Sequence, residues 1–216
     1  MVTITTVSSK DADAKRLITK WATAEDFTQV KSRHNEAKRH DFLVARSAMR
    51  ALLAHATGIS DWHIRSDPNG KPYAITVTGK AGPHISLSHT KGLIACAISQ
   101  EAPIGIDVEY WQGRDFIALA NYAFGPRERE EVARDGISAF YRIWTLREAI
   151  SKTTGVSLIT TFDGDDYGAD APASGCWTTD MWQLFYTSPQ IDYSLAIASK
   201  DDDIWLETSL IWVNYI

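Results

Sequence analysis

The feature that most constrains the fold is a weak internal repeat. Residues 50–60 align with residues 147–157 at an offset of 97, and both segments end in the pattern T-G-[IV]-S. Residues 92–99 (GLIACAIS) align with residues 192–199 (DYSLAIAS) at an offset of 100. Each copy predicts a helix followed by strands, one of them rich in alanine. A chance similarity between short segments is the alternative.

A genuine repeat predicts an α+β chain with two similar lobes, each a mostly antiparallel sheet with one long helix. We expect an N-terminal lobe over residues 1–103 and a C-terminal lobe over 104–216, with the active site in the cleft between them. Residues 163–180, rich in Asp, Gly and Ala, predict a long loop. Helices are expected over 35–57, 115–123, 126–134 and 139–154, and strands over 84–88, 93–99, 104–109, 182–186, 193–199 and 204–212.

The net charge of −5 over 216 residues hides an asymmetry. Residues 1–100 carry a net charge of +6, and residues 101–216 carry −11. A basic half joined to an acidic half suggests an anion held by one part and a cation by the other. Two unevenly charged surfaces without a role are the alternative. The overall acidity disfavours nucleic acid as a partner.

Composition also limits where such a chain works. No apolar run approaches the roughly 18 residues of a membrane span, and the first residues have no secretory signal. Cys96 and Cys176 make neither a disulfide framework nor a metal-ligand cluster. Cys96 lies within an apolar run, where a buried thiol is expected. We therefore expect a cytoplasmic protein with reduced thiols and no membrane partner.

The sharpest local motif is Pro103-Ile-Gly-Ile-Asp-Val-Glu109. In a strand, Gly105, Asp107 and Glu109 share one face, and the branched aliphatic residues share the other. Two carboxylates beside a residue without a side chain suit a hard cation such as Mg²⁺, which takes one or two carboxylates with water and phosphate oxygens. Two acids that simply face water are the alternative.

A second motif lies on the helix expected over residues 139–154. Trp144, Glu148 and Lys152 stand four residues apart on one face, beside an apolar stripe that predicts the buried side. Glu148 is a candidate third metal ligand and Lys152 a candidate phosphate contact. An exposed Glu–Lys pair is the alternative.

A third motif is Ile85-Ser-Leu-Ser88-His89-Thr90, a strand that enters a turn rich in hydrogen-bond donors. Ser88, His89 and nearby backbone amides could hold a phosphate group. A turn-capping serine with a solvent-facing histidine is the alternative. The sequence contains no nucleophile elbow, Walker loop or G-x-G-x-x-G motif.

The order and spacing of these motifs resemble the 4′-phosphopantetheinyl transferase superfamily. The matching segments are Gly-Lys71-Pro72, Ser-Leu-Ser88-His89, Gly105-Ile-Asp107-Val-Glu109 and Trp144-Thr-Leu-Arg-Glu148-Ala-Ile-Ser-Lys152, with Phe124-Gly-Pro-Arg-Glu128 before the last. The length and apparent duplication resemble the two-lobed type that activates surfactin synthetase. The resemblance covers about residues 40–160.

The resemblance implies a reaction and a set of site residues. Such enzymes transfer the phosphopantetheine arm of coenzyme A to a serine of an apo acyl or peptidyl carrier protein, which releases adenosine 3′,5′-bisphosphate. In the family's pattern, Mg²⁺ is held against the pyrophosphate by Asp107, Glu109 and Glu148. Contacts with the coenzyme A phosphates fall to Lys71, Ser88, His89 and Lys152. The serine proton goes to Glu148 or to metal-bound water.

Two positions depart from the family's pattern. The residue before Glu148 is usually lysine, but this chain has Arg147, whose guanidinium can clamp a phosphate and cannot act as a base. In some members a basic residue for the 3′-phosphate stands where this chain has Asp41. The candidates for that role are Arg39, Arg46 and Arg50, and Arg46 ranks first.

Other functions stay open at this point. A non-catalytic module that binds coenzyme A or a nucleotide would use the basic half alone, and a metal-dependent phosphohydrolase would use the carboxylates alone. For a transferase, we expect a monomer that docks an acidic apo carrier protein on its basic N-terminal surface. The motifs leave open whether the carrier serves secondary metabolism (polyketides, nonribosomal peptides, siderophores) or fatty acid synthesis.

Overall fold

The structure is a computed structural model that describes residues 1–156, 166, 168–179, 181–200 and 210–212. The chain divides into two compact units, residues 1–101 with 209–216, and residues 102–208. Strand β10 (Leu210–Trp212) therefore belongs to the first unit, where it pairs in parallel with β1 (Val2–Ser8). The expectation of two separate lobes with a boundary near residue 103 stays a prediction.

The first unit packs helices on one face of a four-stranded sheet. The sheet order is β10-β1-β5-β4, with β4 (His84–Thr90) and β5 (Leu93–Ser99) joined by a tight turn. Helix α3 (Glu36–Thr57) packs on this sheet, and α1 (Ala12–Trp21) packs on α3. The remaining elements are α2 (Ala24–Gln29), a 3₁₀ turn (Val30–Ser32) and the hairpin β2 (Trp62–Ser66) with β3 (Pro72–Thr76).

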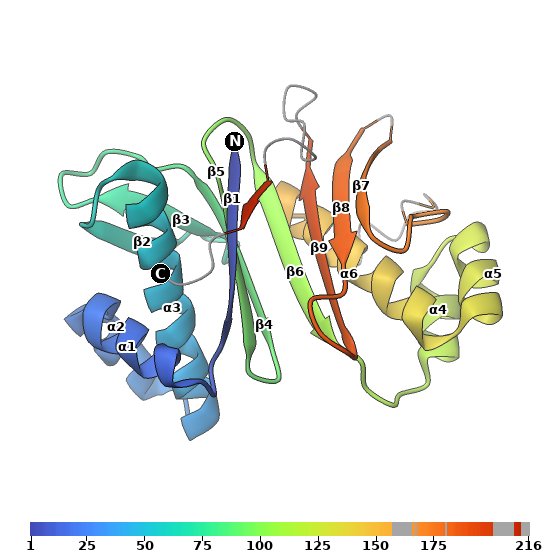
Figure 1. Ribbon diagram of the computed structural model, residues 1–216, viewed down its shortest axis with the longest axis horizontal. Coiled ribbons are helices and arrows are strands. Elements are labelled where there is room, and N and C mark those ends of the chain that lie inside the picture. The colour runs from blue at the N-terminus through green and yellow to red at the C-terminus, as the bar shows by residue number, and fades with distance from the viewer. Residues whose placement is uncertain (157–165, 167, 180, 201–209, 213–216) are drawn as a thin grey trace. The chain divides into compact units, whose positions relative to one another are not determined.

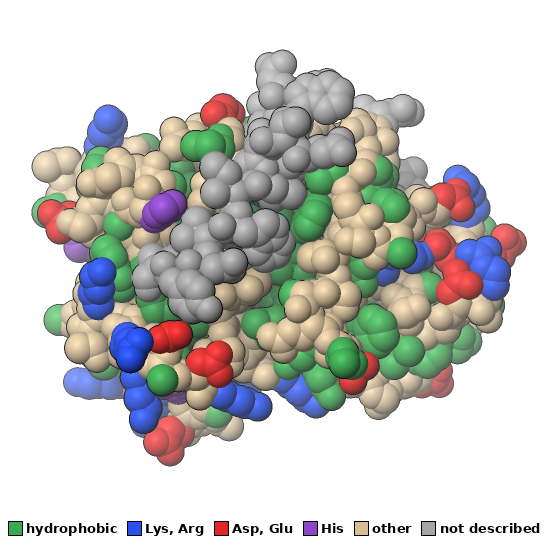
Figure 2. All heavy atoms as spheres, viewed as in Figure 1, with side chains coloured by type: hydrophobic (Ala, Val, Ile, Leu, Met, Phe, Trp, Pro, Cys, Tyr) green, Lys and Arg blue, Asp and Glu red, His purple; other side chains and the backbone are tan. Residues whose placement is uncertain are grey.

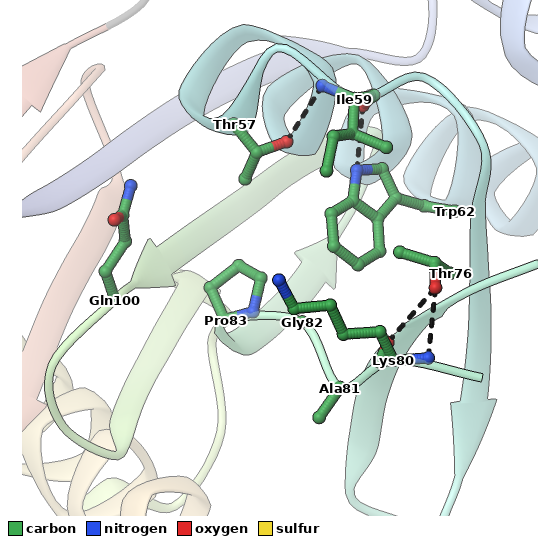
Figure 3. A pocket seen from close by; sticks show the side chains of 9 residues that line it. All are labelled: Thr57, Ile59, Trp62, Thr76, Lys80, Ala81, Gly82, Pro83 and Gln100. Atoms are coloured by element: carbon green, nitrogen blue, oxygen red, sulfur yellow. Dashed lines mark hydrogen bonds between the residues drawn. The ribbon is translucent and has the colours of Figure 1, made fainter. Parts of the chain in front are cut away.

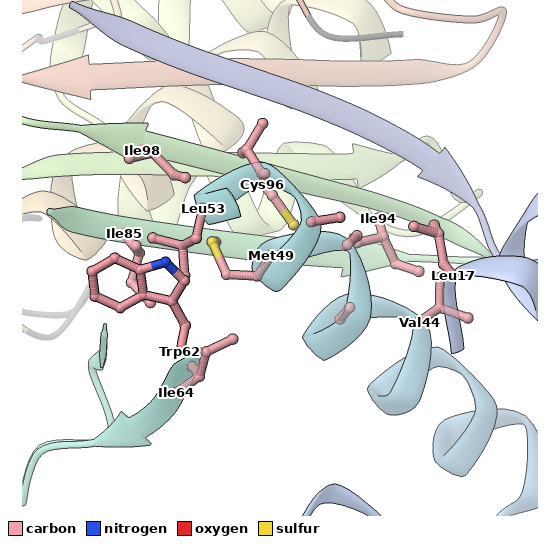
Figure 4. Packing of buried hydrophobic residues seen from close by; sticks show 14 of the residues in the cluster. Leu17, Val44, Met49, Leu53, Trp62, Ile64, Ile85, Ile94, Cys96 and Ile98 are labelled. Atoms are coloured by element: carbon pink, nitrogen blue, oxygen red, sulfur yellow. The ribbon is translucent and has the colours of Figure 1, made fainter. Parts of the chain in front are cut away.

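The core of this unit lies between α3, the sheet and the β2–β3 hairpin (Figure 4). Met49 and Leu53 of α3 contact the apolar face of β5, where Cys96 is fully buried. Each such aliphatic side chain contributes about 1.5–3 kcal/mol when it leaves water. The full burial of Cys96 confirms the buried thiol expected from the sequence, and it raises the pKa of this thiol to about 12.

The second unit has an antiparallel sheet of order β6-β9-β8-β7. Its strands are β6 (Ile104–Tyr110), β7 (Gly175–Thr178), β8 (Gln183–Thr187) and β9 (Tyr193–Ser199). Helix α6 (Ile137–Thr154) lies along one face of this sheet, and α4 (Phe116–Ala123) and α5 (Pro126–Asp135) follow at one end (Figure 1). The mixed α+β class with mostly antiparallel sheets is confirmed, while the duplication and the cleft stay predictions.

Local signals placed most helix ends correctly. Asn35 caps α3, and Asp115 caps α4 by accepting a hydrogen bond from the Ala118 amide at 3.0 Å. The two long helices, α3 and α6, end at Gly58 and Gly155, both in the left-handed conformation that glycine adopts without strain. The loop expected over 163–180 was wrong in part, because β7 forms there by pairing with β8. Most of the strand expected over 204–212 lies outside the described residues.

Candidate active site

Strand β6 approaches helix α6 very closely at Gly105. A Cβ atom at this position would lie 1.9 Å from the Ala149 carbonyl oxygen and 2.6 Å from Thr153 Oγ1, so only glycine permits the contact. Side chains two and four residues along a strand point the same way. Asp107 and Glu109 therefore lie on the face of β6 that packs against α6, as the alternation in the sequence predicted.

Helix α6 places Glu148 and Lys152 beside this face. The apolar stripe expected on the helix, with Leu146 and Ile150, is buried. Glu148 and Lys152 are half-buried one turn apart, and Lys152 Nζ lies 2.6 Å from Asp107 Oδ1. The structure thus brings the second sequence motif against the first, and the alternative of a solvent-exposed Glu–Lys pair does not describe these side chains.

Burial and the charge of Asp107 perturb both glutamates of the site. Burial, and then the charge of Asp107, raises the pKa of Glu109 to about 7, and Glu148 adds to the effect. Burial and the charge of Asp107 also raise the pKa of Glu148. Arg114 and Lys152 oppose the shift at Glu109. Within the described part of the chain, neither glutamate carboxylate accepts a hydrogen bond, so each lacks the partners that stabilise a buried anion.

A hard divalent cation would relieve this repulsion, and oxygen donors are the ligands that Mg²⁺ prefers. Among the described residues, no group of three or more His, Cys, Asp or Glu side chains is already arranged to hold a metal ion. The carboxylates therefore fit such an ion as part of a ligand set, with water or phosphate oxygens as the remaining ligands.

Arg147 does not have the accessible position that a phosphate clamp requires. Its side chain is fully buried, and its Nε and Nη2 atoms lie 3.0 and 2.6 Å from Glu128 Oε2. Because successive helical residues diverge by about 100°, Arg147 points towards α5 while Glu148 keeps its place beside β6. Arg147 thus serves as an internal counter-ion of Glu128, and its expected role in catalysis stays a prediction.

Glu128 is a structural residue to which the sequence assigned no role. Its carboxylate accepts hydrogen bonds from the Gly125 amide at 3.1 Å, the Gly168 amide at 2.9 Å and Arg147. It therefore joins the start of α5, the middle of α6 and the segment at residue 168. The available signal was Pro126 at the first helical position with a glutamate two residues later, a pattern typical of a helix start.

A second unassigned network borders Glu109. Ser194 of β9 is the direct cross-strand partner of Glu109, and it accepts a hydrogen bond from the Trp111 indole at 2.9 Å. The Tyr186 hydroxyl lies 2.9 Å from the same serine oxygen. These buried contacts hold the end of β6 against the sheet. Alternation along β9 could have indicated that Ser194 shares a face with Glu109, once the pairing of the strands was known.

The expected phosphate contacts of the first unit lie near the start of β3 and along β4. Lys71 immediately precedes β3, and its charge adds to burial in lowering the pKa of His84 on β4. Desolvation lowers the pKa of Lys71 itself. Ser88 is buried and His89 is exposed, and as neighbours in a strand they point to opposite faces.

The three early arginines differ in their contacts. Arg50 is buried and pairs with Asp26 through contacts of 2.5 and 3.1 Å, so it is committed to the core. Arg39 is exposed and donates to the Arg33 carbonyl. Arg46 is half-buried, donates to the Ile64 carbonyl at 2.8 Å and covers the Phe42 ring. Burial lowers the pKa of Arg46.

A cavity of about 330 Å³ opens elsewhere in the first unit. The Trp62 indole forms part of its wall and is fixed by a hydrogen bond of 2.8 Å to the Ile59 carbonyl, and Lys80 extends towards Gly82 (Figure 3). None of the expected site residues lines this cavity.

No helix in the described part of the chain is long and apolar enough to cross a membrane.

Comparison with known proteins agrees with the β6–α6 site. Residues 103–195 match the family model described as ACPS: 4'-phosphopantetheinyl transferase superfamily. The 4'-phosphopantetheinyl transferase HetI of a Nostoc species is 28% identical over 167 residues, which cover 74% of this chain and 70% of HetI.

Two further relatives match over shorter stretches. The 4'-phosphopantetheinyl transferase AcpT of Salmonella typhi is 39% identical over 77 residues, 33% of this chain and 40% of AcpT. The holo-[acyl-carrier-protein] synthase of Bacillus subtilis is 37% identical over 73 residues, 30% of this chain and 60% of the relative. The chain therefore spans less than two thirds of these two relatives. The family match over residues 103–195 and these relatives confirm the resemblance to the 4′-phosphopantetheinyl transferase superfamily that the motifs indicated.

Proposed function

We propose that this protein transfers the 4′-phosphopantetheine arm of coenzyme A to a serine of an apo carrier protein in a Mg²⁺-dependent reaction. The observation that carries the proposal is the convergence of three carboxylates and a lysine between β6 and α6. The Lys152–Asp107 contact of 2.6 Å supports it, and so does the charge of Asp107, which adds to burial in raising the pKa values of both Glu109 and Glu148. It falls within the residues that match the family model.

The proposed reaction is a phosphoryl transfer. The carrier serine oxygen forms a bond to the phosphorus that bears pantetheine, and the bond from that phosphorus to the bridging oxygen breaks. The leaving adenosine 3′,5′-bisphosphate takes the bonding electron pair. Asp107, Glu109 and Glu148 would hold Mg²⁺, which neutralises charge on the pyrophosphate oxygens when bound. Placed positive charge lowers the energy of such a transition state.

Two of this chain's residues have further roles in the proposal. Lys152 supplies an ammonium group to a phosphate of coenzyme A. Glu148, which is half-buried on α6, or a water molecule held by the metal would accept the serine proton. Arg147, buried against Glu128, is not among the reacting groups.

Lys71, Ser88, His89 and Arg46 complete the proposal as contacts for the phosphates of coenzyme A. Arg46 is preferred for the 3′-phosphate because Arg50 is engaged with Asp26. Changing Arg46 to Ala should raise the KM for coenzyme A more than it changes kcat.

We further propose that an acidic carrier protein docks on the basic cluster, defined as Lys31, Arg33, Lys38 and Arg39. All four side chains are exposed near the start of α3. On the face shown in Figure 2, several Lys and Arg side chains lie over the α1–α3 part of the first unit, interspersed with Asp and Glu side chains. Opposite charge raises the rate of encounter more than it raises the final affinity. Changing the cluster to Ala should raise the KM for the carrier protein, with a smaller effect at high salt.

Intact-mass analysis tests the activity directly. An apo acyl or peptidyl carrier protein, incubated with the enzyme, coenzyme A and Mg²⁺, should gain the mass of one phosphopantetheine group. Glu109→Ala and Glu148→Ala should each reduce the rate at least about 100-fold, while Glu130→Ala, an exposed change on α5, serves as the matched control. Near-normal rates in either site variant would refute the three-carboxylate assignment. Tight coenzyme A binding without transfer, unaffected by Mg²⁺, would instead support a non-catalytic binding module.

A further inference from the structure

Lys152 contacts one of the three carboxylates and acts on the other two through its charge. Its Nζ lies 2.6 Å from Asp107 Oδ1, and the side chain of Asp107 is only 4% exposed. The positive charge of Lys152 also lowers the pKa values of Glu109 and Glu148, which burial and Asp107 raise. The ammonium group therefore interacts with all three carboxylates and serves as a cation that the fold itself supplies.

We propose that Lys152 is the internal counter-cation of these carboxylates in the free protein and weakens metal binding until coenzyme A draws its ammonium group to a phosphate. The inference rests on the proposed function, because it uses the same carboxylates as metal ligands. It adds that the metal and coenzyme A bind interdependently, since the same side chain responds to both.

The physical reason is competition for one set of oxygen atoms. An ammonium 2.6 Å from Asp107 Oδ1 repels a divalent cation that enters beside it, and the repulsion is large where water is largely excluded. The lysine stem is flexible, so the ammonium can leave while α6 stays in place. At Glu109 the charge of Arg114 lowers the pKa more than that of Lys152 does, but only Lys152 also contacts Asp107 and acts on Glu148. If coenzyme A tightens metal binding, the metal must tighten coenzyme A binding by the same factor.

Binding of Mn²⁺ to the free, full-length protein tests the proposal without any turnover. Loss of the free-ion electron paramagnetic resonance signal at pH 8 reports the dissociation constant. Lys152→Met removes the charge and keeps a long side chain, and it should bind Mn²⁺ at least tenfold more tightly than the wild type. Lys152→Arg keeps the charge and should behave as the wild type does. Lys15→Met, an exposed change on α1, is the matched control for the loss of one lysine.

A second titration, with coenzyme A present and no carrier protein, measures the coupling. Coenzyme A should increase the Mn²⁺ affinity of the wild type, and this increase should be at least threefold smaller in Lys152→Met. Circular dichroism checks that each variant is folded.

The proposal is overturned if Lys152→Met binds Mn²⁺ no more tightly than the wild type, including the case where neither binds. It is also overturned if Lys152→Arg binds as tightly as Lys152→Met, because charge would then not be the cause. If the wild type transfers phosphopantetheine in the mass assay but Lys152→Met gains no Mn²⁺ affinity, this inference is refuted and the proposed function stands. If Lys152→Met binds Mn²⁺ more tightly but the wild type transfers no phosphopantetheine, the role of Lys152 as counter-cation is supported and the proposed function is refuted.

Discussion

The buried Glu128–Arg147 pair offers the sharpest test of how α6 is held in place. Both side chains are fully buried, and Arg147 makes contacts of 3.2, 3.0 and 2.6 Å with the two carboxylate oxygens. Glu128→Gln keeps an oxygen for the Gly125 or Gly168 amide and removes the charge. Arg147 then loses the charge of Glu128, and breaking a buried pair in this way costs about 3–5 kcal/mol.

For a chain of this size, 1 kcal/mol shifts the melting temperature by roughly 2–4 °C, so we expect a fall of about 10 °C. The double variant Glu128→Gln/Arg147→Met removes both charges together. It should recover most of the lost stability, with a coupling energy of at least about 2 kcal/mol in the double-mutant cycle. Chemical denaturation of the two single variants and the double variant measures this energy.

The exposed Arg134–Asp135 pair on α5 is the matched control. Asp135→Asn should leave stability unchanged within error, because solvent screens an exposed pair. A loss below about 1 kcal/mol in Glu128→Gln, or a double variant as unstable as the sum of the single ones, would refute the reasoning.

Three further predictions follow from the packing. Gly105→Ala should destabilise the protein by at least about 2 kcal/mol and reduce transfer activity, because the new Cβ would meet the Ala149 carbonyl. In the control variant Gly113→Ala the new Cβ meets no atom within 4 Å, so stability should not change. Equal losses of stability for the two variants in urea denaturation would contradict this account. Burial alone would raise the pKa of Asp26, but the hydrogen bonds from Arg50 and Thr23 hold it below its usual value. The ionised Asp26 carboxylate therefore stabilises the folded protein above its unfolded pKa, and this stabilisation is lost as pH falls through its folded pKa. Asp26→Asn should be less stable than the wild type at pH 7, and the difference should shrink at acid pH. A difference that stayed constant with pH would argue against the Asp26–Arg50 pair as its cause. Native protein at pH 8 should react with iodoacetamide at Cys176 and not at Cys96, whose thiol is buried with a pKa of about 12; mass mapping of a label on Cys96 would show that the core opens.

The local signals in the sequence were sufficient where structure depends on near neighbours. Asn35 and Asp115 mark helix starts, Gly58 and Gly155 mark helix ends, and the alternation in β6 identifies its polar face. These features depend on capping, left-handed backbone and side-chain period, all of which act within a few residues.

Features that depend on distant partners could not be predicted in this way. Strand β7 is four residues long and exists by pairing with β8, so its segment was interpreted as loop. Strand β10 joins the first unit through parallel pairing with β1, across about 200 residues of chain. The hairpin β2–β3 and the helices α1 and α2 were not predicted, and their packing on α3 and β4 is again a contact between distant segments.

The sequence by itself determined the residue types of the site and their order along the chain, and the resemblance assigned their chemistry. Only the tertiary structure decided which of these residues lie close together. Close packing at Gly105 sets Asp107 and Glu109 against α6, and the 100° step between helical neighbours turns Glu148 towards β6 and Arg147 towards Glu128. The sequence motif presents Arg147 and Glu148 as adjacent members of one site. The fold separates them, because a helix sends neighbouring side chains to different faces, and only packing decides which face is buried.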